Sequence, residues 1–131
     1  MTDEIFPKVK EAIQESLGIP GDKIHLKARI IDDLGSDSLD LLDILFALEE
    51  KFKIKIKRGQ IEAMAREGIS EEEFQKDGEL SEIGAQRLRE VLPEVDQSQI
   101  KAGMPLTRIP HLLTVETFCR LVEHKLEQKK G

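Results

Sequence analysis

The pattern of apolar and polar positions predicts a mostly helical chain. Apolar residues that recur every four positions predict a first helix over residues 3–17, and Gly18 is a natural C-terminal stop. The residues of this apolar stripe are Ile5, Val9, Ile13 and Leu17. Residues 19–36 then form a long connection, which scattered apolar residues are expected to hold against the core.

A second helix is expected from about Ser38 to Phe52, with Asp37 or Ser36 accepting a hydrogen bond from its first turn. One apolar stripe of this helix should face the core: Leu41, Ile44, Leu45, Leu48 and Phe52. Three other apolar residues fall on nearly the opposite side, among acidic residues: Leu39, Leu42 and Phe46, beside Asp43, Glu49 and Glu50. A helix that needs only to pack would not need this second patch.

The rest of the chain is predicted to hold shorter elements. Residues 53–59 alternate basic and apolar side chains and are expected to be extended. No partner strand is evident, so a loop is favoured over a strand. The elements expected beyond it are a helix over 60–67, a turn capped by Ser70 with Glu73, a helix over 81–92, a loop over 93–110, a helical turn near 110–113, and a last helix from Thr114 to about Gln128.

Composition and charge narrow the class of protein. A chain of 131 residues is expected to form one domain, and five Phe without Trp or Tyr indicate an aliphatic core. The net charge of −6 argues against a nucleic-acid partner, because phosphate binding needs clustered Lys and Arg. Cys119 is the only cysteine, and neither its surroundings nor the three His have the spacing of a metal site. No apolar run is long enough to cross a bilayer and no signal peptide is evident, so a cytoplasmic location is expected.

Ser38 is the residue with the clearest chemical interest. It stands at the start of an acidic helix, and residues 32–50 contain seven acids and no base. A serine with no base beside it is a poor nucleophile by itself, so this is a place to attach a group rather than a catalytic centre. A hydrolase is further disfavoured because the Gly-x-Ser-x-Gly pattern is absent.

The residues around Ser38 carry a family resemblance. The run Asp33-Leu34-Gly35-Ser36-Asp37-Ser38-Leu39, with its preceding helix and following acidic helix, closely resembles the modification site of acyl carrier proteins. The resemblance implies an all-α, four-helix bundle that is not an enzyme. It implies that Ser38 receives 4′-phosphopantetheine from coenzyme A through a Mg-dependent holo-acyl-carrier-protein synthase. The thiol of that arm would then carry acyl groups as thioesters.

The same resemblance implies a docking surface for acyltransferases or synthases with basic surfaces. The residues that match docking positions of the family are Asp37, Leu39, Asp40, Leu42, Asp43, Phe46, Glu49 and Glu50. An acidic helix of this kind steers basic partners by long-range attraction. A monomer is expected.

The chain departs from the family pattern in two ways. Ser36 replaces a small apolar residue and adds a second hydroxyl, but only Ser38 is followed by Leu39. About 45 residues, from about 57 to 101, are inserted before the expected third helix, so the bundle should carry extra short helices. A basic run leads into this insert: Lys51, Lys53, Lys55, Lys57 and Arg58. It could meet a membrane surface or an acidic partner, or it could balance the acids of residues 32–50.

The enlarged size favours a specialised carrier, and acylation of lipid A and lipopolysaccharide in bacteria is the expected pathway. A polyketide-type carrier is the alternative within this class, whereas a peptidyl carrier would have glycines in place of Ser36-Asp37. The alternative from a different class is an adaptor protein. Its acidic helix would bind partners, but the protein would never receive the phosphopantetheine arm. Loading of Ser38 separates a carrier from an adaptor.

Overall fold

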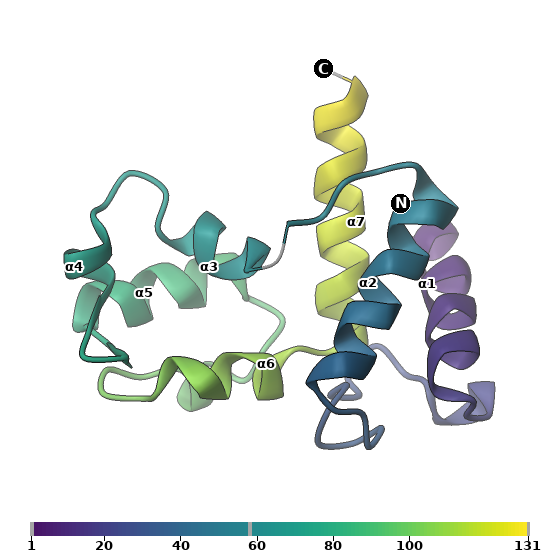
Figure 1. The fold of residues 1–131 in the computed structure, drawn as a ribbon, viewed down its shortest axis with the longest axis horizontal. Helices are drawn as coiled ribbons and strands as arrows, with labels where there is room; N and C mark the ends of the chain where they lie inside the picture. Colours follow the sequence, from purple (N-terminus) through teal and green to yellow (C-terminus); the bar gives the residue numbers. More distant parts are fainter. Residues whose placement is uncertain (1, 58, 131) are drawn as a thin grey trace. The chain divides into compact units, whose positions relative to one another are not determined.

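The computed structural model describes residues 2–57 and 59–130. Within these residues the chain divides into two compact units. The first joins Met1–Ile56 to Leu113–Gly131, and the second comprises Lys57–Leu112. Both are mainly helical, which confirms the all-α class with additional short helices (Figure 1). The second unit begins where the insert was expected and extends beyond residue 101, whereas the organisation as a single domain stays a prediction.

Three long helices build the first unit: α1 (Thr2–Leu17), α2 (Ser38–Phe52) and α7 (Val115–Lys130). Each packs on the other two. Their buried apolar residues form one core, which includes Val9, Ile13, Ile44, Leu48, Val115, Phe118 and Val122. Cys119 is fully buried in the same core, and this burial raises the pKa of its thiol to about 12. Cys119 therefore packs as a small core residue.

The connection between α1 and α2 contains a short 3-10 turn, η1 (Gly21–Lys23), and is fastened to the start of α7. Ile24 and Ile30 anchor it in the core. Its backbone then runs beside residues 113–116: Ile30 N donates to Leu113 O at 3.0 Å, and Glu116 N donates to Leu26 O at 2.9 Å. The loop that leads to Ser38 therefore has fixed backbone partners.

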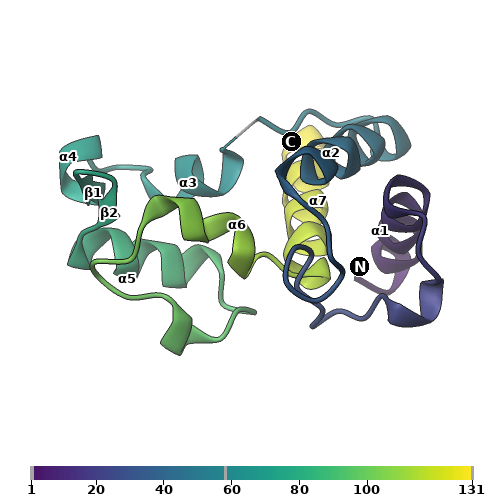
Figure 2. The same ribbon diagram turned by 60° about the horizontal axis from the view of Figure 1, so that its bottom comes forward.

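The second unit consists of short elements. They are α3 (Gln60–Ala65), α4 (Glu71–Phe74), β1 (Gln75–Lys76), β2 (Glu79–Leu80), α5 (Glu82–Val91), η2 (Gln97–Gln99), η3 (Leu106–Arg108) and α6 (Ile109–Leu112). Helix α5 packs against both α3 and α4, and β1 pairs with β2 in an antiparallel hairpin (Figure 2). Phe74, Leu88, Leu92 and Ile100 are among its fully buried side chains.

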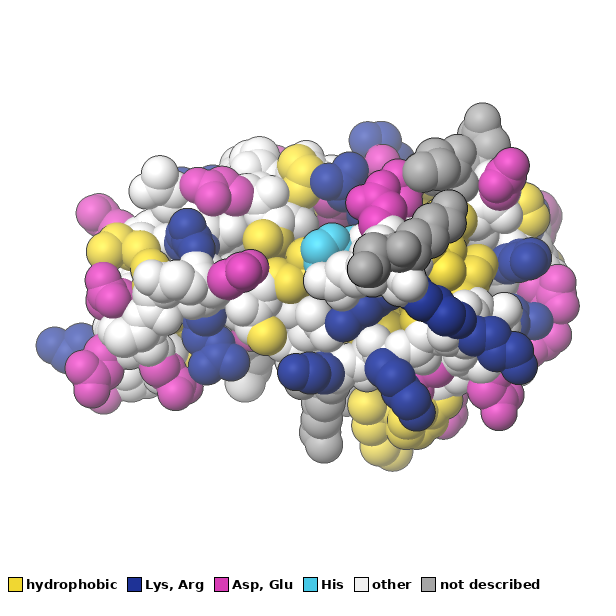
Figure 3. Space-filling model, turned by 90° about the horizontal axis from the view of Figure 1, so that it is seen from above, with side chains coloured by type: hydrophobic (Ala, Val, Ile, Leu, Met, Phe, Trp, Pro, Cys, Tyr) yellow, Lys and Arg dark blue, Asp and Glu magenta, His cyan; other side chains and the backbone are white. Residues whose placement is uncertain are grey.

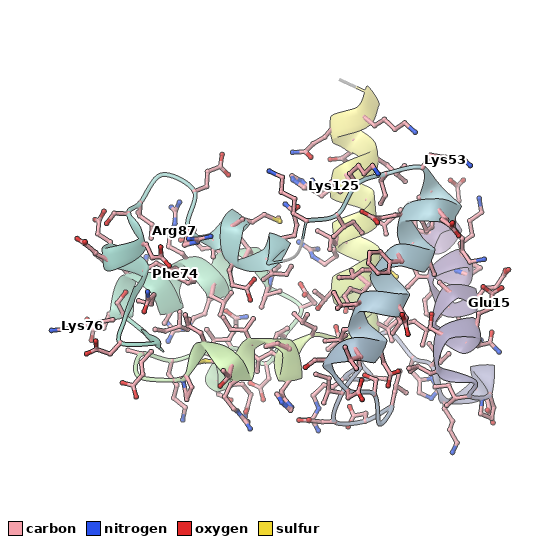
Figure 4. All side chains as sticks on the ribbon, viewed as in Figure 1. Glu15, Lys53, Phe74, Lys76, Arg87 and Lys125 are labelled. Carbon is pink, nitrogen blue, oxygen red and sulfur yellow. The ribbon has the colours of Figure 1, made fainter. Side chains whose placement is uncertain are left out.

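Polar contacts and the close approach of Gly84 to the backbone carbonyl of Phe74 hold these short elements together. Ser81 caps α5 by accepting from Gly84 N at 2.9 Å, and the carbonyls of Glu73 and Phe74 share the single proton of its hydroxyl. Arg87 of α5 donates to the carbonyls of Ala65 and Glu67 (Figure 4). These bonds satisfy backbone groups that such short helices leave free at their ends.

The predicted element boundaries are close to the observed ones. Helix α2 spans the predicted residues, and the capping box of Ser70 with Glu73 is present. The hairpin with its Asp77-Gly78 turn was missed, and the expected loop over 93–110 contains the turns η2 and η3. Among the described helices, none is long and apolar enough to cross a membrane.

Candidate attachment site

Ser38 is the first residue of α2 and is exposed. Asp37 is the N-cap: its Oδ1 accepts from Asp40 N at 2.9 Å, while Asp40 Oδ2 accepts from Asp37 N at 3.1 Å. This reciprocal capping box fixes where α2 begins and how the chain enters it. Of the two N-caps that the sequence allowed, the structure uses Asp37.

The two hydroxyls of the motif have different environments. Ser36 is only 6% exposed, and its Oγ donates to Ile30 O at 2.9 Å. The Ser38 hydroxyl points to no hydrogen-bond partner within residues 2–57 and 59–130 and lies at the surface. An incoming group can therefore reach Ser38 without breaking a contact, whereas reaching Ser36 would require the loop to open.

Arg29 organises the loop that precedes the site. Its guanidinium forms ion pairs with Asp33 at 3.1 Å and Asp32 at 3.3 Å, and its backbone N donates to Asp33 Oδ2 at 2.8 Å. These contacts, the hydrogen bond from the Arg29 side chain foremost, lower the pKa of the Asp33 carboxyl. In the described part of the chain, no group of three His, Cys, Asp or Glu side chains could hold a metal ion.

The outer face of α2 carries the predicted docking residues. Leu39 is 71% exposed and Phe46 is 61% exposed, far more than is usual for large apolar side chains. Leu42 is half-buried between them, and Asp43 and Glu50 are exposed. The helix thus presents apolar and acidic side chains together on its solvent side.

Two of the predicted docking acids also bind backbone within the protein. Asp40 belongs to the capping box, and Glu49 Oε2 accepts from Ile56 N at 2.7 Å. Both are half-buried. The Asp-x-x-Asp spacing of residues 37–40 is the pattern of a capping box and could have revealed the first contact, whereas no local pattern reveals the second.

Known proteins are similar in sequence to this part of the chain. Residues 7–66 match the family model described as a phosphopantetheine attachment site. The chain is 50% identical over 52 residues to an acyl carrier protein of Bdellovibrio bacteriovorus, covering 40% of this chain and 67% of that protein. It is 41% identical over 66 residues to an acyl carrier protein of Thermotoga maritima, covering 50% of this chain and 82% of that protein. The chain belongs to the acyl carrier protein family.

As a member of this family the carrier holds a covalently attached 4′-phosphopantetheine and is not an enzyme. Its residues fit such a group, because a phosphodiester link needs an accessible hydroxyl, and α2 begins with one. The start of a helix also favours the negative charge of a phosphate. Proteins of this family work with synthases and acyltransferases.

Proposed function

We propose that Ser38 carries the phosphopantetheine arm and that the chain delivers acyl groups between enzymes of a specialised bacterial lipid pathway. The observation that supports Ser38 is the contrast with Ser36: one hydroxyl is exposed at a capped helix start, and the other is buried and bonded to Ile30 O. The arm supplies a terminal thiol that takes acyl groups as thioesters.

The residues around Ser38 present the hydroxyl but do not activate it. The seven acids and absent bases of residues 32–50 leave deprotonation to the holo-synthase. In the transfer, the Ser38 oxygen forms a bond to the phosphorus of coenzyme A that bears pantetheine. The bond from that phosphorus to the nucleotide part breaks, and the serine proton passes to a base of the synthase. The capping box holds Ser38 in place during this step.

The outer face of α2 provides the contact with partner enzymes. Leu39 and Phe46 supply apolar contact, and the exposed acids Asp37, Asp43 and Glu50 attract basic surfaces over a longer range. Asp40 and Glu49 contribute mainly through the backbone bonds that shape this face. Salt screens such docking between exposed charges and keeps it weak, so a carrier can leave one enzyme for the next.

The second unit supports the proposal of a specialised pathway. Residues 57–112 have their own buried apolar residues, which an ordinary carrier would not need. This elaboration favours a carrier dedicated to particular enzymes, and lipid A acylation in the cytoplasm is the pathway we propose. Acyl transfer from the loaded chain to a lipid A acyltransferase tests it. Transfer only within a polyketide synthase would instead assign the alternative pathway.

Intact mass after coexpression with a holo-synthase tests the attachment site. The unaltered chain should gain the mass of one phosphopantetheine, and Ser38→Ala should abolish the gain. Ser36→Ala is the matched control: it removes the buried hydrogen bond to Ile30 O at a cost of about 1 kcal/mol and should leave loading intact. Loading that persists in Ser38→Ala, or a chain that is never loaded, as an adaptor would be, contradicts the proposal.

A further inference from the structure

An open groove lies at the C-terminal end of α2, away from Ser38. Its volume is about 820 Å³, and all of its lining residues belong to the first unit. They are Phe46, Glu49, Glu50, Lys53, Ile54, Lys55, Lys125, Gln128 and Lys129. Helix α2 and the segment after it provide the first six, and α7 provides the last three.

The groove is held in shape by its own contacts. Lys53 ends α2 in the left-handed conformation, with φ of 57°, which turns the chain away from the helix axis. Ile54 is buried in the core, and Ile56 N donates to Glu49 Oε2 at 2.7 Å. Across the groove, Lys129 Nζ donates to Lys53 O at 2.7 Å and links α7 to the end of α2.

The lining combines apolar surface with positive charge. Phe46 and Ile54 are apolar, and four lysines stand around them: Lys53, Lys55, Lys125 and Lys129. Figure 4 shows Lys53 where α2 ends and Lys125 on the neighbouring α7. Figure 3 shows basic side chains gathered beside apolar surface at this end of the unit. This charge is opposite to that of the helix start, where acids surround Ser38.

The basic run in the sequence is only partly explained by charge balance. Lys51 pairs with Glu11 at 3.0 Å and with Glu15 at 3.6 Å, and both acids belong to α1, outside residues 32–50. Lys53 and Lys55 instead line the groove. Arg58 lies outside the described residues. Two lysines of the run therefore join two lysines of α7 in a separate positive site.

We infer that this groove binds an anionic amphiphile, a small molecule with an apolar body and a phosphate or carboxylate head. Its volume is in the range of small-molecule sites, which bury an apolar body and fix it with a few polar groups. Phe46 would supply most of the contact with the body, because it is 61% exposed whereas Ile54 is only 7% exposed. The lysines would surround the head. The Glu49 carboxylate accepts a hydrogen bond from Ile56 N, so this carboxylate is directed toward the protein backbone.

A membrane surface fits the groove less well. A flat anionic bilayer would also meet Glu50 and the other acids of α2, and the whole chain carries a net charge of −6. Within the groove a single small anion meets four lysines and only two acids, Glu49 and Glu50, and Glu49 already accepts a hydrogen bond from Ile56 N. The site is non-covalent and independent of Ser38, so it goes beyond the carriage of acyl groups.

Binding of octyl phosphate to the full-length Ser38→Ala chain tests the inference. This variant cannot take the arm at position 38, so failure here leaves the proposed attachment untouched. Amide shifts in a ¹H–¹⁵N spectrum should saturate for residues 46–55 and 125–129. Inorganic phosphate, which lacks the apolar body, and octyl glucoside, which lacks the charge, should each bind at least about tenfold more weakly.

The double variant Lys55→Gln/Lys125→Gln removes one charge from each side of the groove. Its affinity for octyl phosphate should fall at least about fivefold at low ionic strength. The matched control, Lys23→Gln/Lys27→Gln, removes two exposed lysines of the same unit and should bind as before. Shifts that map elsewhere, or equal affinity in the double variant, would overturn the inference. It would also be overturned if an acidic leucine–glutamate peptide or phosphatidylglycerol vesicles bound through the same lysines in preference to octyl phosphate.

Discussion

The two units of this carrier are stabilised in different ways. The first packs three long helices around one continuous apolar core. In the second unit, the longest helix among the described residues is α5, and most of the helices described there are single turns. Helices this short are unstable alone, so contacts beyond their own turns must hold them. In the second unit these are a glycine contact, serine caps and arginine bonds to backbone carbonyls.

The two units therefore differ in which residues their stability depends on. In the first unit a polar contact such as that of Arg29 with Asp33 lies at the surface, and the core does not depend on it. In the second unit, Gly84 and Arg87 occupy the places where two elements meet. A substitution at either position should therefore lower the stability of the second unit more than the size of the changed side chain suggests.

The largest effect is expected for Gly84→Ala. The added Cβ would collide with the carbonyl oxygen of Phe74, a backbone atom that cannot move aside as a flexible side chain can. The expected loss of stability in the second unit is about 3 kcal/mol. Hydrogen exchange should show lost amide protection over 60–92 and retained protection in α1, α2 and α7.

Gly21→Ala is the control for this change. Its Cβ would meet only the flexible ends of Lys10 and Gln14, so a small effect on the first unit is expected. If Gly84→Ala lowered protection equally in both units, the comparison would fail, because the two units would then unfold as one.

A smaller effect is expected for Arg87→Leu. The change keeps much of the apolar stem but leaves the carbonyls of Ala65 and Glu67 without the guanidinium. Loss of about 2 kcal/mol is expected, which urea unfolding followed by hydrogen exchange in α3 can measure. Arg108→Leu, an exposed arginine of the same unit, should change stability little. An equal loss in both variants would show that the carbonyl bonds of Arg87 do not matter.

The smallest effect concerns Asp33 and its dependence on pH. Because Arg29 lowers the pKa of Asp33 in the folded state, the ionised carboxylate stabilises the fold above its unfolded pKa. This contribution should be lost as pH falls through the folded pKa. Asp33→Asn should therefore be slightly less stable than the unaltered chain near pH 7, and the difference should vanish in acid. Asp22→Asn is the control, and a difference that grows in acid would contradict the assignment.

Much of the first unit could be predicted from the sequence because its signals are local. The spacing of Leu41, Ile44 and Leu48 fixes the buried face of α2, and Asp37 precedes it as a cap. The burial of Ser36 could not be predicted, because its partner is the carbonyl of Ile30 across a loop. The hydrogen bond of Glu49 to Ile56 N likewise depends on the left-handed turn at Lys53.

The second unit was harder to predict because its contacts join residues far apart in the chain. The hairpin has a local signal, Asp77-Gly78, but its strands are too short to show alternation. Arg87 donates to carbonyls about 20 residues earlier in the chain, and no local sequence pattern predicts these hydrogen bonds. Short capped helices such as α4 were found because Ser70 and Glu73 form a recognisable pair.

The backbone bonds between residues 26–30 and residues 113–116 have a consequence for biosynthesis. The ribosome makes the segment before Ser38 early, but its partners emerge only after the whole of Lys57–Leu112. A nascent chain thus exposes a serine whose surroundings are unfinished. The loop before Ser38 can reach its final hydrogen bonding only once residues 113–116 have been made, so an incomplete copy presents the serine after a loop that lacks these partners.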